Sequence, residues 1–183
     1  LQPGCFIKVK GLVAFDSFDK EKTITNVIGI AKTDDFSIRR KDTAKEKRVE
    51  LHCHTKSSDM DGVSDVKTIV RNAYNWGMPA VAITDHGVMY GCIDFYKAAK
   101  AAGIKPIIGC EVYVARRNIE DRIYGIDNDP YHLVLLCENR KGYENLCKLV
   151  SEGFIHGFYG KPRVDLDLLN RYHEGLIALS ACL

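Results

Sequence analysis

The sequence lacks several features that would assign it to common functional classes. No run approaches the roughly 18 consecutive apolar residues of a membrane-spanning helix, so we expect no membrane partner. No glycine-rich GxxxxGKS/T loop occurs, which excludes P-loop nucleotide binding. The formal net charge is only +2, too small to indicate nucleic-acid binding by itself. The opening LQPGCFIKVKG also lacks the layout of a secretory signal, and it has no initial Met, which is typical of a fragment or a processed chain.

The seven cysteines form no CxxC pair and no regular spacing. A scattered odd number of cysteines in 183 residues is typical of reduced thiols, so we expect a cytoplasmic protein. Most lie in apolar runs such as IIGCEVYV, where cysteine behaves as a small hydrophobic residue. Cys53 or Cys182 would be available for Cys–His nucleophilic catalysis, but such a nucleophile does not need the many other polar groups described below.

Residues 1–37 predict a small β segment. FIKVKGLVAF and KTITNVIGI alternate or are β-branched, and polar DSFDKEK separates them, which predicts a hairpin. The following residues are polar and charged, and we assign 38–47 as a linker. A hairpin with a linker buries too little for a core of its own, so we expect it to be part of a larger β-domain.

From Arg48 onward the pattern changes to alternating strands and helices, and we assign 48–183 to a second domain. Apolar runs predict strands at 49–55, 80–86, 106–115, 132–139 and 176–182, and helical spacing predicts helices at 65–76, 93–103, 141–154 and 165–174. Residues 116–130 have the composition of a loop. This order predicts an α/β fold with parallel strands covered by helices, and both an open doubly wound sheet and a barrel fit it.

Polar residues gather on these predicted strands. His52 and His54 lie two apart on the first strand and so share a face, while Asp85 and His86 end the second. Glu111 stands in an apolar run, where an unpaired carboxylate would cost several kcal/mol and a metal ion would supply a partner. His132 opens the fourth strand and Cys182 ends the fifth. Imidazole, carboxylate and thiolate groups together favour a site for zinc, manganese or iron.

Several segments resemble a known family. HCHTKSSDMDG, ITDH, IIGCEV and the closing LSAC are similar to the PHP (polymerase and histidinol phosphatase) superfamily, and more narrowly to the PHP domain of bacterial replicative DNA polymerase III alpha subunits. The front, with KVKGLVAFDSFDKEKTI and RKDTA, looks like part of the OB-fold of the PolC type, whereas the part from VMYG onward is closer to the DnaE type. Together these segments cover most of residues 38–183.

The resemblance implies a distorted (β/α)7 barrel with up to three divalent metal ions, zinc foremost and manganese or iron next. Asp85 would orient a metal-bound histidine from behind. The family's final Asp-x-His pair would follow Cys182, and the sequence ends at Leu183, so we expect a barrel that lacks its last strands. The resemblance assigns as ligands seven residues: His52, His54, Asp61, His86, Glu111, His132 and Cys182.

The resemblance further implies a piece of a DNA polymerase, with magnesium-dependent DNA synthesis in the parent protein and with DNA and replisome subunits such as the sliding clamp as partners. The metal site would support phosphoester hydrolysis, such as 3′→5′ exonuclease activity. The hairpin and the basic segment 38–48 are the candidates for DNA contact, although we expect Phe15 and Phe18 to be core residues. Two alternatives stay open: a metal-stapled structural module without catalysis, and a stand-alone phosphoesterase of the histidinol-phosphatase kind, against which the OB-like front argues.

Overall fold

The computed structural model describes residues 2–36 and 41–181. The chain divides into two compact units, Leu1–Lys41 and Asp42–Leu183, and the boundary lies inside the predicted linker. No helix in the described ranges is long and apolar enough to cross a membrane.

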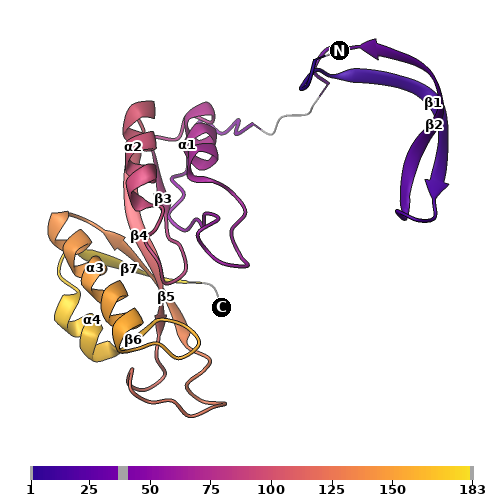
Figure 1. Cartoon of the computed structure of the whole chain (residues 1–183). Coiled ribbons are helices and arrows are strands. Elements are labelled where there is room, and N and C mark those ends of the chain that lie inside the picture. The colour runs from indigo at the N-terminus through magenta and orange to yellow at the C-terminus, as the bar shows by residue number, and fades with distance from the viewer. Residues whose placement is uncertain (1, 37–40, 182–183) are drawn as a thin grey trace. The chain divides into compact units, whose positions relative to one another are not determined.

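The first unit is the predicted hairpin (Figure 1). Strands β1 (Ile7–Asp16) and β2 (Glu21–Lys32) pair antiparallel, with a register irregularity between Lys10 and Leu12. Both faces of this hairpin carry exposed apolar side chains. Phe15 and Phe18 were expected to be core residues, but they are exposed by 66% and 91% and so are not buried within this hairpin.

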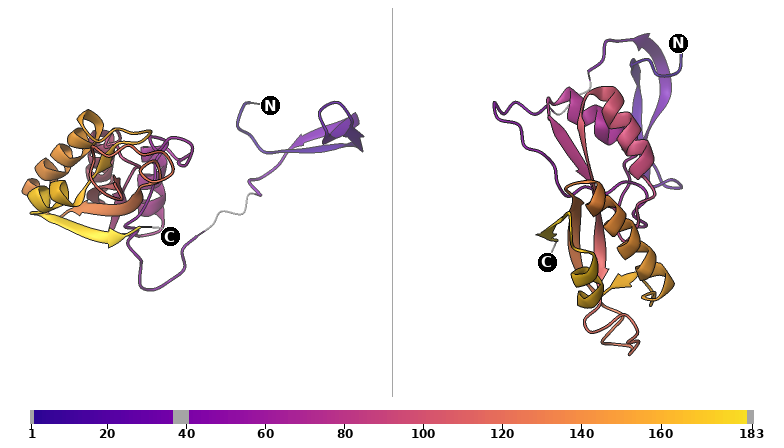
Figure 2. Two further views of the ribbon diagram at one scale, coloured as in Figure 1. Left: turned by 90° about the horizontal axis from the view of Figure 1, so that it is seen from below. Right: turned by 90° about the vertical axis from the view of Figure 1, so that its left-hand side faces the viewer.

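The second unit is a mixed sheet covered by helices (Figures 1 and 2). The strand order is β3 (Ala80–Ile83), β4 (Lys105–Val114), β5 (Tyr131–Cys137) and β7 (Leu176–Ser180), and the two-residue β6 (Arg163–Val164) also pairs with β4. The helices are α1 (Val66–Asn75), α2 (Cys92–Ala102), α3 (Arg140–Ile155) and α4 (Leu166–Tyr172). The predicted helices therefore lie within a few residues of those observed.

The strands are not all parallel, which corrects the sequence-based prediction. β3 and β6 run parallel to β4, but β5 is antiparallel to both β4 and β7. The reason is local, because only the loop 115–130 joins β4 to β5. A parallel crossover usually needs a helix, whereas antiparallel neighbours do not.

The two faces of the sheet have different surroundings. Leu133 and Leu135 of β5 pack in the cluster that includes α3 and α4, whereas Val134 and Leu136 belong to a separate cluster with Leu51 and Ala82. Glu111 is paired with Val134 across the β4–β5 ladder and therefore shares its face. His132, two residues before Val134, lies on that face too. The polar residues of interest thus lie on the face away from α3 and α4.

The strand predicted at 49–55 does not form. Only Glu50 makes an isolated bridge, to Val81. The backbone N–H groups beyond it donate to side chains instead of a neighbouring strand: His52 to Glu50, Cys53 to Thr84 and Thr55 to Asp85. These side-chain acceptors replace the regular ladder, and residues 51–55 form an irregular segment beside β3.

Candidate metal centre

The buried carboxylate of Glu111 lies at the centre of the candidate site. Its Oε2 is 2.5 Å from His52 Nε2 and 3.1 Å from His54 Nε2. Its Oε1 is 2.8 Å from His132 Nδ1 and 3.9 Å from His86 Nδ1. Each carboxylate oxygen therefore faces two imidazoles. This arrangement places Glu111 in the position of a bridging carboxylate.

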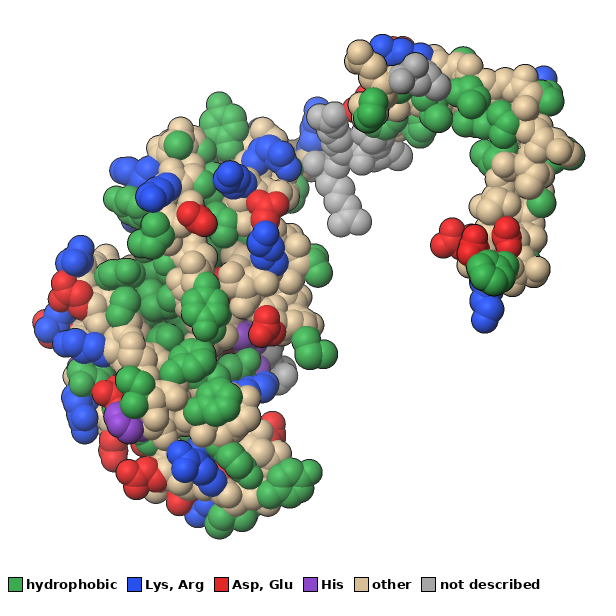
Figure 3. All heavy atoms as spheres, in the orientation of Figure 1, with side chains coloured by type: hydrophobic (Ala, Val, Ile, Leu, Met, Phe, Trp, Pro, Cys, Tyr) green, Lys and Arg blue, Asp and Glu red, His purple; other side chains and the backbone are tan. Residues whose placement is uncertain are grey.

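Asp61 closes the exposed side of the cluster. Its Oδ2 lies 2.9 Å from His86 Nε2 and 3.8 Å from His54 Nε2, and its side chain is 52% exposed. The rings of His54 and His86 stack with their centroids 4.3 Å apart and an interplanar angle of 6°. Figure 3 shows histidine side chains that reach the surface with acidic and basic side chains near them. A ligand from solvent can thus approach the cluster where Asp61 lies.

The electrostatics of the cluster favour ligating forms of its residues. Burial alone would raise the pKa of Glu111, but hydrogen bonds with His52 and His132 outweigh burial and lower that pKa below its ordinary value. Burial lowers the pKa of His86, and the charges of Glu111 and Asp61 compensate only in part. An ionised carboxylate and a neutral imidazole are the forms that bind metals.

The loop that carries His54 is held by a buried polar network. Asp85 Oδ1 accepts from the Thr55 backbone N–H at 2.6 Å and from Ser58 Oγ at 2.7 Å, and Asp85 Oδ2 accepts from Thr55 Oγ1 at 2.9 Å. Ser58 Oγ lies 3.4 Å from His54 Nδ1 and accepts the backbone N–H of His86 at 3.1 Å. All three side chains are almost fully buried. The network therefore fixes the positions of two candidate ligands at once.

Asp85 was predicted to orient a metal-bound histidine, and the structure shows which groups its carboxylate contacts. Its carboxylate hydrogen-bonds Thr55 and Ser58, and Ser58 stands between it and the His54 ring. The sequence did not predict a role for Thr55 and Ser58, because small hydroxyl residues in a segment such as TKSSDMDG are typical of solvent-exposed turns. Nothing in their local spacing distinguishes a buried hydroxyl from an exposed one.

The donor set fits divalent metal ions. Three overlapping groups bring potential ligand atoms within 4.8 Å of one another: His52–His54–Glu111, His54–Asp61–His86 and His86–Glu111–His132. His86 Nδ1 is buried and has no hydrogen-bond partner in the part of the chain that the structure describes. An orphaned buried nitrogen next to a shared carboxylate is expected at a metal position. Nitrogen and oxygen donors suit zinc, manganese or iron.

Six of the seven predicted ligands therefore lie together, although they come from distant parts of the sequence. Glu111 lies on β4 and His132 on β5, while His86 follows β3 and the others lie in the segment before α1. Cys182, the seventh, lies outside the described residues. Tyr113 was also missed by the sequence analysis: its ring stacks on that of His86, with centroids 5.6 Å apart.

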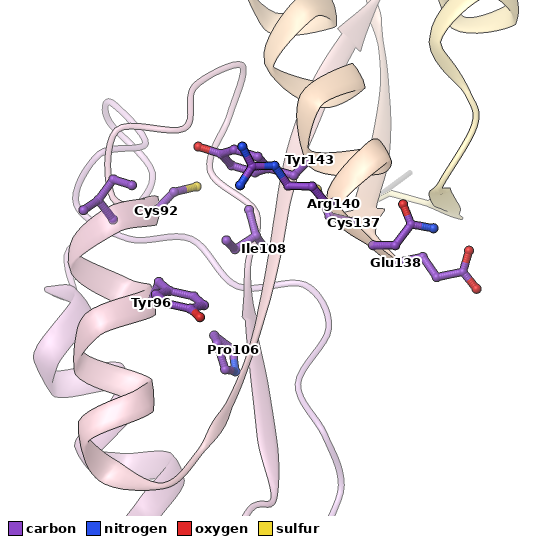
Figure 4. A pocket seen from close by; sticks show the side chains of 10 residues that line it. Cys92, Tyr96, Pro106, Ile108, Cys137, Glu138, Arg140 and Tyr143 are labelled. Carbon is purple, nitrogen blue, oxygen red and sulfur yellow. The ribbon is translucent and has the colours of Figure 1, made fainter.

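A separate pocket of about 480 Å³ lies between α2, β4, β5 and the start of α3 (Figure 4). Its walls are mostly apolar and include Tyr96, Ile108 and Tyr143, with Arg140 at the edge. None of the six candidate ligands that the structure describes lines it. The histidine–carboxylate cluster around Glu111 and this mostly apolar pocket are therefore lined by different residues.

Comparisons with known proteins identify the family of the segment that carries these residues. Residues 50–183 match the family model of the PHP domain. The chain is 48% identical over 136 residues to the DNA polymerase III subunit alpha of Chlamydia pneumoniae, a match that covers 74% of this chain and 11% of that protein. The corresponding subunit of Treponema pallidum is also 48% identical over 136 residues, with 74% and 12% covered. The chain thus spans only about an eighth of the length of these relatives.

Among solved structures, a Bifidobacterium adolescentis protein assigned as a metal-dependent phosphoesterase aligns with 57% of this chain and 32% of its own, at TM-score 0.42 and 24% identity. This likeness is too low to carry an argument. The family model covers the segment that contains all the candidate ligands, and the resemblance of this segment to the PHP domain of DNA polymerase III alpha subunits is confirmed. The chain belongs to the PHP domain family.

Proposed function

We propose that this chain is the PHP-containing part of a bacterial DNA polymerase III alpha subunit, and that its histidine–carboxylate cluster binds divalent metal ions and hydrolyses phosphoesters. The observation that carries the proposal is the fully buried Glu111, with two imidazoles facing each of its oxygens. A carboxylate shared in this way is suited to hold two cations close together. The specific activity we propose is the removal of nucleotides in the 3′→5′ direction by a cytoplasmic polymerase subunit.

The residues of the cluster would have different roles in such a site. Glu111 and the four histidines would hold the ions, and Asp61 would complete the exposed edge where substrate arrives. Asp85, through Thr55 and Ser58, keeps the His54 loop in place. Bound divalent ions would polarise the phosphate and lower the pKa of a water molecule to supply hydroxide. The buried Glu111 side of the cluster is closed, so water and substrate share the Asp61 side.

The finer parts of the proposal come from the family resemblance described in the sequence. Zinc is the preferred ion, manganese or iron the next, with up to three ions and Cys182 as a further ligand. The sheet would be the first part of a distorted (β/α)7 barrel, and the hairpin part of an OB-fold whose remaining strands cover its exposed apolar faces. DNA synthesis with magnesium, and DNA and the sliding clamp as partners, would belong to the longer protein.

A second candidate function, a purely structural metal staple, is favoured by one observation. The cluster joins segments up to 80 residues apart, from His52 to His132, so bound ions would cross-link the sheet to the irregular 51–61 segment. Such a site would stabilise the fold without turnover. The two functions share the ligands and differ in hydrolysis alone.

Elemental analysis of the purified chain tests both candidates. We expect about two or more equivalents of zinc, manganese or iron in the wild type, and loss in Glu111→Gln and in the His52→Ala/His54→Ala double variant. His156→Ala is the matched control, since His156 pairs with Glu152 on the surface of α3 and should retain the metal. Folded wild-type protein that stays metal-free after reconstitution would overturn the metal proposal.

Hydrolysis separates catalysis from a staple. The loaded wild type should release nucleotides from the 3′ end of a labelled oligonucleotide, and the Glu111→Gln variant should not. Metal retention with no hydrolysis, together with a higher melting temperature on loading, would leave the structural staple as the function.

A further inference from the structure

A lysine lies one aromatic ring away from the candidate metal centre. The Nζ of Lys161 is 4.5 Å from the centroid of the Tyr113 ring. That ring stacks on His86 at an interplanar angle of 11° and meets His132 edge-on, with centroids 5.0 Å apart. Tyr113 is itself only 8% exposed. The ammonium group is therefore connected to two candidate ligands through a single packed side chain.

The backbone holds Lys161 at this place. Tyr159 and Lys161 form a bridge around Gly160, whose φ of 70° is in the left-handed region. Two residues later, Arg163 pairs with Tyr113 where β6 joins β4. The fully buried Arg163 side chain donates to three backbone carbonyls, which fixes this end of the turn.

The contact with the loop after β3 is equally close. A Cβ at Gly87 would lie 2.8 Å from Pro162 Cγ and 3.1 Å from Tyr113 Cε2. Pro162 therefore packs directly against the residue that follows His86. The turn that carries Lys161 is part of the wall of the cluster and not a distant surface loop.

Within residues 2–36 and 41–181, no carboxylate lies within 4.0 Å of the Lys161 Nζ, although other surface cations such as Arg116 and Arg140 are paired. Its cation–π contact is worth only about 0.5–1 kcal/mol at an exposed site. Such a contact positions the ammonium group without competing strongly against an anion. A compact ammonium group is a good point-charge ligand for phosphate.

We propose that Lys161 binds a second phosphate of the substrate, next to the phosphate that reacts at the metal centre. This inference rests on the proposed hydrolytic function and specifies its substrate class. The substrate carries neighbouring phosphates, as in a nucleic-acid strand or a nucleoside polyphosphate, and an isolated phosphoester is a poorer ligand. Lys161 is a specificity residue in this scheme, and it neither holds metal nor transfers protons.

The test compares three variants with the wild-type chain. Lys161→Ala removes the ammonium group, Lys161→Arg keeps a cation, and Lys148→Ala is the matched control. Lys148 is an exposed lysine whose Nζ lies 5.5 Å from the Tyr172 ring, on helices α3 and α4 and away from the cluster. All four proteins are assayed for metal content, for equilibrium binding of a fluorescent single-stranded oligonucleotide, and for hydrolysis of that oligonucleotide and of bis(p-nitrophenyl) phosphate.

We expect Lys161→Ala to raise both Kd and KM for the oligonucleotide about tenfold, the effect of losing one charge-assisted contact of roughly 1.4 kcal/mol. The slope of log Kd against log salt should fall by about 0.7, as for one phosphate contact on a single strand. Metal content and kcat/KM for bis(p-nitrophenyl) phosphate, which has one phosphate, should not change. Lys161→Arg should restore most of the affinity, and Lys148→Ala should resemble the wild type.

Equal effects of Lys161→Ala and Lys148→Ala, or no effect of either, would overturn the proposal, as would loss of metal in Lys161→Ala. If the wild type binds no metal, the proposed hydrolysis fails. In that case the role of Lys161 is tested by comparing the oligonucleotide affinity of the metal-free wild type with that of Lys161→Ala. A tenfold difference in Kd supports the role of Lys161, and equal Kd values contradict it.

Competition by a nucleoside diphosphate and by a nucleoside monophosphate identifies the source of the second phosphate. Displacement by the diphosphate alone indicates a polyphosphate, and displacement by neither indicates a strand.

Discussion

Replacement of Arg163 by methionine should strongly destabilise the second unit. The Arg163 side chain is fully buried, and burial lowers its pKa. Its Nε, Nη1 and Nη2 donate to the carbonyl oxygens of Gly157, Asp127 and Ile119 at 3.0, 3.0 and 2.9 Å. Methionine keeps the apolar stem but removes these side-chain donors, and of the three carbonyls the Gly157 oxygen still accepts the backbone N–H of residue 163 at 3.4 Å.

Each buried carbonyl left unsatisfied costs about 1–3 kcal/mol, and some of the loop carbonyls regain water when the turn relaxes. We therefore expect a loss of about 3–5 kcal/mol in the free energy of unfolding, measured by urea denaturation with unchanged slope. Arg140→Met is the control, since Arg140 is exposed, pairs with Glu144 and lies over the Tyr143 ring at 5.9 Å, and it should cost about 1 kcal/mol or less.

Hydrogen exchange locates the effect of the Arg163→Met substitution. Amides in 116–130 and 157–163 should lose protection first, because Arg163 connects these two segments. If Arg163→Met does not fold, Arg163→Lys, which keeps one cation but not the three-way fork, gives a smaller loss to measure. A loss below about 1 kcal/mol in either variant would refute the assignment of Arg163 as the anchor of this turn.

Three further predictions concern the cluster. In the folded chain the pKa of His86 is lowered from 6.5 and that of Glu111 from 4.5, so the unfolded chain binds more protons. The stability of the metal-free protein should therefore fall as the pH drops below about 6.5, and again below about 4.5. Thermal melts between about pH 4 and 8 with a constant midpoint would contradict this. Ser58→Ala should weaken metal binding about 10–100-fold in a chelator competition, because Ser58 connects Asp85 to the His54 ring, whereas undiminished affinity would show that the connection is unimportant. Gly62→Ala should displace Asp61 and lower metal content, since a Cβ there would lie 1.8 Å from the Thr55 carbonyl oxygen, and Gly29→Ala in the hairpin, where the nearest atom is 3.9 Å away, should not.

Much of the fold was predictable because its signals are local. Asp65 caps α1 through its side chain, and Gly103, with a φ of 72°, ends α2, as their positions in the sequence indicate. The hairpin follows from two β-branched runs around a polar turn. Glu111 was conspicuous because a carboxylate in an apolar strand requires a partner, and the structure surrounds it with four imidazoles.

What was missed depends on contacts between distant segments. The segment 51–55 looks like a strand by its alternation, yet its N–H groups are taken by Glu50, Thr84 and Asp85. The two-residue β6 carries too little sequence signal to be recognised, and its position follows from Arg163. The position of Lys161 near the cluster likewise depends on its contact with the ring of Tyr113, which lies 48 residues earlier in the sequence.

The wide sequence separation of the cluster has a consequence for the order of folding. His52 and Glu111 are 59 residues apart, and His132 lies 21 residues beyond Glu111, so the contacts form only after long loops have closed. The last pair depends on antiparallel docking of β5 against β4, and the complete ligand set therefore arises late, when the central sheet is already assembled. During synthesis the chain exposes its histidines one after another without offering a finished site. Metal uptake in refolding should accordingly follow the slowest sheet-forming phase, which makes the ion a reporter of the completed fold.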